Sequence, residues 1–80
     1  MNEEESVKII AEEYKKLLKD YDHVDNIFKL MGIVYERQEL LVAAVISRDH
    51  NSVIMAAAML GAASLAVLTK GVTSEPVSTA

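Results

Sequence analysis

Residues 52–69 carry no charged side chain, and this feature constrains the fold more than any other. The run reads SVIMAAAMLGAASLAVLT. As a helix it would be about 27 Å long, slightly shorter than a hydrocarbon core of about 30 Å. Its mean hydropathy exceeds the usual level for a membrane-spanning helix. Apolar side chains point in every direction around it, and such a helix is buried in a larger structure or in lipid.

The rest of the chain is too short to cover this helix on all sides. The protein has 80 residues, which is one small domain at most. A helix over 24–48 can cover one side, and a helix over 3–21 offers only a narrow apolar stripe. Large exposed apolar patches usually mark a protein interface or a membrane contact. The sequence therefore predicts either assembly or membrane insertion.

Before the uncharged run, apolar residues recur at alternating steps of three and four, which is the spacing of a coiled-coil seam. The heptad seam consists of Val7, Ile10, Tyr14, Leu17, Tyr21, Val24, Phe28, Met31 and Tyr35. Gln38 takes the next position, and Val42 and Val45 continue the spacing. Other apolar residues widen the stripe after Val24, so burial on more than one side is expected there. The three tyrosines are expected to pack in the seam.

These patterns predict a single all-α domain over residues 1–80, built as a helical hairpin with an additional N-terminal amphipathic helix. We place helices at 3–21, 24–48 and 52–70, and an extended tail at 71–80. Asp22 and Asp25 resemble a capping box, but residues 3–48 could equally form one long kinked helix. Asn51 or Ser52 is the expected N-cap of the last helix. Lys70 and Gly71 suit its C-terminal end.

Small residues recur along the last helix at intervals that let two helix backbones approach closely. Ala58, Ala62 and Ala66 form one row, and Ala57 and Gly61 form a second row beside it. We expect these residues to pack between subunits. The larger side chains expected in the same contact are Met55, Met59 and Leu65.

The polar residues do not form a recognisable catalytic, cofactor or metal site. The chain has no cysteine, which excludes disulfides and thiolate ligands. His23 and His50 lie in expected turns without the spacing of paired metal ligands. Gly32, Gly61 and Gly71 stand alone, so no phosphate-binding loop is present. The net charge of −4 argues against nucleic acid as a main partner.

We expect a non-enzymatic structural protein that assembles with copies of itself, as in a filament, a pilus, a coat or a membrane-associated oligomer. A soluble helical-bundle module and a small single-span, holin-like membrane protein are the alternatives. The layout is similar in outline to helical-hairpin pilins and small coat proteins of filamentous assemblies, without a shared motif. Lipid is the alternative partner, and no small-molecule substrate or cofactor is expected. An extracellular filament, a virion or a membrane is favoured over the cytoplasm, although no cleavable signal peptide is seen.

Overall fold

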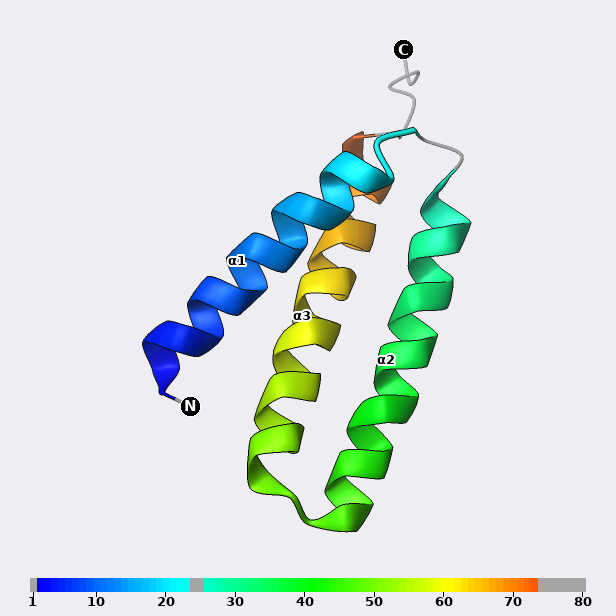
Figure 1. Cartoon of the computed structure of the whole chain (residues 1–80). Coiled ribbons are helices and arrows are strands. Elements are labelled where there is room, and N and C mark those ends of the chain that lie inside the picture. The colour runs from blue at the N-terminus through cyan, green and yellow to red at the C-terminus, as the bar shows by residue number, and fades with distance from the viewer. Residues whose placement is uncertain (1, 24–25, 74–80) are drawn as a thin grey trace.

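The computed structural model describes residues 2–23 and 26–73, which form three helices (Figure 1). They are α1 (Glu3–Asp20), α2 (Ile27–Ser47) and α3 (His50–Thr73). α2 and α3 form an antiparallel hairpin, and α1 crosses α3 obliquely, so that α3 packs against both other helices. The described residues contain no strand, and the predicted all-α fold is confirmed.

α1 begins and ends with the polar groups that a solvent-exposed helix needs. The Asn2 side chain accepts a hydrogen bond from the Glu5 amide at 2.8 Å, and Glu3, Glu4 and Glu5 lie in the positive first turn. At the other end the Tyr21 amide donates to the Leu17 carbonyl at 3.0 Å. The helix therefore ends at Asp20, one residue before the predicted end.

The helix that begins at Glu3 ends at Asp20, and a second helix begins at Ile27, so residues 3–48 form two helices and not one. α2 begins at Ile27 after Asn26, three residues later than predicted. The Asn26 amide donates to the His23 carbonyl at 2.9 Å. In a helix capped by Asp22 the same amide would donate to the Asp22 carbonyl. Val24 and Asp25, and with them the expected capping box, lie outside the described residues. Gly32 lies inside α2, where the helix continues without a break.

The hairpin turn is shorter than predicted because Arg48 and Asp49 make it alone. Arg48 adopts the left-handed conformation, with φ 58°, and its amide donates to the Val45 carbonyl at 3.1 Å. Asp49 then caps α3, since its carboxylate accepts from the Ser52 amide at 3.3 Å and from the Ser52 hydroxyl at 2.7 Å. Asn51 and Ser52 are therefore inside the helix, and the prediction that one of them caps it is wrong.

α3 also runs further than predicted, through Gly71 to Thr73. A Cβ on Gly71 would lie 3.8 Å from Ile27 Cδ1, so this residue packs beside the start of α2 and does not end the helix. The Lys70 Nζ donates to the Asp22 carbonyl at 2.6 Å, which ties the end of α3 to the α1–α2 connection. The predicted extended tail is thus wrong for residues 71–73, and its remainder lies outside the described residues.

The core is small and lies where all three helices approach one another. Leu17 of α1, Leu30 of α2, and Ala63 and Ala66 of α3 form its buried centre. Leu30 is the one large side chain that is fully buried in the described part of the chain. Partly buried residues that pack around this centre are Tyr14, Leu18, Tyr21, Ile33, Val34 and Val67. Such a core gives little redundancy, so each large member matters.

We predict that Leu30→Ala destabilises the fold by about 2–5 kcal/mol, because it removes the one large side chain that is fully buried among the described residues and leaves a cavity. Val7 is 61% exposed on α1. Val7→Ala is the control, and we expect it to change the free energy of unfolding by at most about 0.5 kcal/mol. Urea denaturation followed by circular dichroism measures both. Equal effects of the two variants would contradict this core.

The cap at Asp49 gives a second prediction. The hydrogen bonds from Ser52 lower the pKa of the Asp49 carboxyl below its ordinary value. A lowered pKa in the folded state stabilises the fold at neutral pH, and this contribution disappears as the pH falls through that pKa. Asp49→Ala should lower the melting temperature at pH 7. Asp49→Asn should lower it less, because the amide oxygen still accepts a hydrogen bond from the start of α3. A melting temperature of Asp49→Ala equal to that of the parent would show that the cap contributes nothing.

Candidate interaction surface

The N-terminal part of the heptad seam packs inward, as its spacing suggests. Leu17 is buried, and Ile10, Tyr14 and Tyr21 are partly buried. The Tyr14 hydroxyl shares a hydrogen bond with the Thr69 hydroxyl at 2.9 Å, which joins α1 to α3. Val7, near the start of α1, is 61% exposed. The seam therefore contacts α3 along most of α1.

The rest of the seam does not continue this contact. Phe28 is 77% exposed and Tyr35 is 65% exposed, and Met31 is also outside the core. The expectation of one stripe running from α1 into α2 is wrong, because the break before Ile27 ends the first helix and starts a new one with its own orientation. α2 uses another face for the core. Its inward residues are Leu30, Ile33, Val34, Arg37, Leu41 and Ala44.

α2 is therefore apolar on two faces, of which only one is covered. The uncovered face keeps the heptad spacing and contains one polar residue. We call this set the outer stripe: Phe28, Met31, Tyr35, Gln38, Val42 and Val45, all of them exposed. Seen down the helix, the centre of the outer stripe lies about 110° from the buried Leu30, a little more than a quarter turn. An exposed stripe with coiled-coil spacing is typical of a helix that packs against another helix.

The small residues of α3 divide between the inside and the outside of the chain. Ala58, Ala62 and Ala66 are buried, and they face the other helices of the same chain. Met59 is partly buried, and Met55 is exposed at 42%. The second row lies on the outside with two leucines and a valine. We call this set the outer face of α3: Ala57, Gly61, Leu65, Leu68 and Val72.

The outer stripe and the outer face of α3 meet in one groove. Its walls are Met31, Tyr35 and Gln38 of α2 and Ser64 and Leu68 of α3, and its floor is made by Val34 and Val67. A Cβ built on Gly61, in the outer face of α3, would meet nothing within 4 Å. We call the two sets with this groove the apolar outer surface. No charged residue belongs to it.

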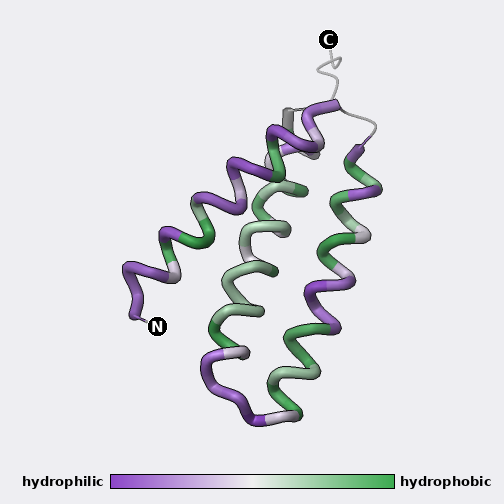
Figure 2. The backbone as a smooth tube through the Cα atoms, viewed as in Figure 1, coloured by the Kyte–Doolittle hydropathy of each residue, from purple (hydrophilic) through white to green (hydrophobic). Residues whose placement is uncertain are grey.

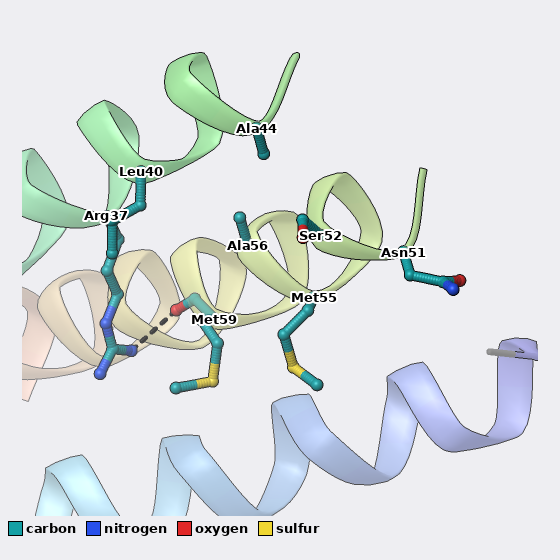
Figure 3. A pocket seen from close by; sticks show the side chains of 8 residues that line it. All are labelled: Arg37, Leu40, Ala44, Asn51, Ser52, Met55, Ala56 and Met59. Atoms are coloured by element: carbon teal, nitrogen blue, oxygen red, sulfur yellow. Dashed lines mark hydrogen bonds between the residues drawn. The ribbon is translucent and has the colours of Figure 1, made fainter. Parts of the chain in front are cut away.

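Arg37 is a polar residue that connects all three helices. Figure 3 shows its contact with Met59 of α3. One guanidinium nitrogen donates to the Met59 carbonyl of α3 at 2.8 Å, and the other pairs with the Glu13 carboxylate of α1 at 2.6 Å. Both side chains are largely buried, with exposed fractions of 16% for Arg37 and 14% for Glu13. A second groove, between Leu40 and Ala44 of α2 and the first turns of α3, opens beside this contact.

The spacing of residues in the sequence does not single out Arg37 or Glu13. The available signal was a lone arginine at an inward position of α2, seven residues after Leu30. Its role could not be read from spacing alone, because the interaction joins residues that are 24 positions apart. It depends on how α1 crosses the hairpin.

Among the residues that the structure describes, the remaining polar side chains do not gather into a chemical site. His23 and His50 are both exposed; His50 begins α3 at the hairpin turn, whereas His23 precedes α2. Within the residues that the structure describes, no group of three histidine, aspartate or glutamate side chains could hold a metal ion. Arg48 lies in the hairpin turn, and Lys70 bonds the Asp22 carbonyl.

One helix among the described residues, His50–Val72, is long and apolar enough to cross a membrane. In its most apolar window only 22% of the residues are buried. Figure 2 shows that apolar residues follow one another along α3 after its first turn, whereas hydrophilic residues interrupt α2 near its middle. Much of α3 is therefore covered neither by α1 nor by α2.

Comparison of the chain with protein-family models, with curated proteins and with solved structures gave no match.

We expect the position of α1 to depend on the contact between Arg37 and Glu13. Arg37→Met removes the ion pair and both hydrogen bonds, and we expect a loss of about 1–3 kcal/mol in the free energy of unfolding. Glu13→Gln keeps an acceptor for Arg37 and should cost less. Urea denaturation measures the loss, and hydrogen exchange of the α1 amides locates it. Unchanged exchange in α1 of Arg37→Met would contradict this role.

Proposed function

We propose that this protein is a non-enzymatic structural subunit that assembles with copies of itself through the apolar outer surface. The observation that carries the proposal is the exposure of large apolar side chains along both helices of the hairpin. On α2 and α3 these residues are Phe28, Met31, Tyr35, Leu40, Val42, Val45, Ile46, Met55, Leu65, Leu68 and Val72. Isolated exposed apolar residues are normal, but a contiguous patch marks an interaction site.

The size of the patch suits a protein interface. The exposed fractions of the eleven residues range from 38% to 77%. Eight of the eleven belong to the apolar outer surface, since Leu40, Ile46 and Met55 lie outside it. A whole large apolar residue exposes about 150–250 Å², so these eight expose about 100 Å² each, or about 800 Å² in all. A standard protein–protein interface buries about 800 Å² per partner. The apolar outer surface is therefore large enough to support stable self-association.

The charges of α2 favour protein over lipid as the covering partner. Glu36, Arg37 and Glu39 lie in adjacent turns of α2, and the Arg37 bond to Met59 places them beside the middle of α3. If α3 crossed a bilayer in this fold, those charges would lie near the bilayer centre, where each is costly. Insertion of α3 alone would first require separation from both other helices. A single-span protein is thus the less favoured candidate, although the length and hydropathy of α3 suit one.

Leu68→Glu tests the proposal. It places a charge on the outer face of α3 without touching the core, since Leu68 is 64% exposed. Val7→Glu is the matched control, because Val7 is 61% exposed on α1, outside the apolar outer surface. We expect Leu68→Glu to keep its helix content and to shift the chain toward monomer in size-exclusion chromatography with light scattering. Val7→Glu should assemble as the parent does.

Assembly of Leu68→Glu that equals that of the parent would contradict a role for this surface. Particles that pellet without detergent and are released as small species by mild detergent would indicate lipid as the partner and overturn the proposal. A discrete dimer or tetramer would support self-association. It would also favour a closed helical bundle over an extended filament.

A further inference from the structure

We propose that the outer stripe of α2 pairs with the outer stripe of a second copy in antiparallel orientation, about a two-fold axis between Tyr35 and Gln38. This inference rests on the proposed self-assembly and names its contact. The pattern of the outer stripe indicates which kind of partner covers it. Six consecutive positions of the outer stripe keep steps of three and four, and this repeat suits a partner helix that runs nearly along α2.

The volumes along the outer stripe favour the antiparallel orientation. Its N-terminal half holds the bulky Phe28, Met31 and Tyr35, and its C-terminal half holds the smaller Val42 and Val45. In an antiparallel pair Phe28 lies opposite Val45 of the second copy, and Met31 lies opposite Val42. Large residues then face small ones along the whole contact, as well-packed helix interfaces require. A parallel pair would place Phe28 against Phe28 and Val45 against Val45, and the helices would diverge at one end.

The middle of the stripe gives the contact its register. Gln38 is the one polar residue in the outer stripe, and a single polar residue at a seam position fixes the register of coiled coils. In the antiparallel pair Gln38 lies opposite Tyr35 of the second copy, within the reach of its hydroxyl. A slip by one step would place Gln38 against an apolar residue and leave its amide without a partner.

The groove beside the stripe provides space for the second helix. Ser64 and Leu68 form its far wall and are uncharged, as is all of 51–69. A copy of α2 that contacts Met31, Tyr35 and Gln38 would extend over this wall. By the two-fold symmetry, α2 of the first chain would cover the same wall of the second chain. The two hairpins would form a four-helix arrangement with α1 of each chain outside it. This also explains how part of the outer face of α3 becomes covered.

Disulfide trapping tests the orientation directly, because the natural chain has no cysteine. The variants are Phe28→Cys, Val45→Cys, Tyr35→Cys and Gln38→Cys, each as the intact chain, with one partner lengthened by a tag so that mixed dimers separate by size. Glu36→Cys is the control, since Glu36 is exposed on the same helix and faces away from the outer stripe. A disulfide needs Cα atoms about 4.4–6.8 Å apart, so only facing positions react efficiently.

We expect oxidation of a Phe28→Cys and Val45→Cys mixture to give several times the dimer yield of either variant alone. Gln38→Cys faces Tyr35 of the second copy, so it should give more dimer in a mixture with Tyr35→Cys than alone, and Glu36→Cys should give little. Efficient self-dimers of both Phe28→Cys and Val45→Cys would indicate a parallel pair and overturn the inference. Yields no higher than the Glu36→Cys control, in a chain that light scattering shows to be oligomeric, would overturn it while self-assembly stands. A monomeric parent chain would overturn both.

Discussion

This structure depends on one constraint, which is that α1 and α2 are not enough to cover the apolar surface of α3. The helix is apolar around its whole circumference, and two neighbours can cover only part of it. α2 covers one side and α1 crosses a second, which leaves Leu65, Leu68 and Val72 on the outside. The fold therefore buries its small residues, Ala58, Ala62 and Ala66, and exposes larger ones on a neighbouring side of the same helix, about a quarter turn away. Part of the apolar surface of this helix is thus left exposed in the single chain.

Polar contacts add to the apolar packing of Leu17, Leu18 and Tyr21 in positioning α1, and they help a small core to hold three helices. Arg37 joins Glu13 and the Met59 carbonyl near the middle of the hairpin. Tyr14 and Lys70 add contacts from α1 and its connection to the last turns of α3. The core itself has one large fully buried side chain, Leu30.

The sequence predicts the helices better than it predicts which face of each is covered. The 3-and-4 spacing and the uncharged run identify all three helices to within a few residues at each end. The heptad seam was expected to be continuous, but the turn before Ile27 changes the orientation of the second helix, and spacing alone carries no information about that change. Both faces of α2 are apolar, so the choice between Leu30 and Phe28 for the core depends on tertiary packing. The cap at Asp49 was missed because Asn51 and Ser52 are equally good capping residue types. Arg37 was missed because its partners lie on other helices.

The central claim is that a second copy of the chain covers the apolar outer surface. Sedimentation equilibrium of the intact parent chain, without detergent and over a wide concentration range, tests it most directly. The account predicts a mass of at least two chains that returns toward one chain on dilution and does not require lipid or detergent. A mass of a single chain at every concentration would contradict it.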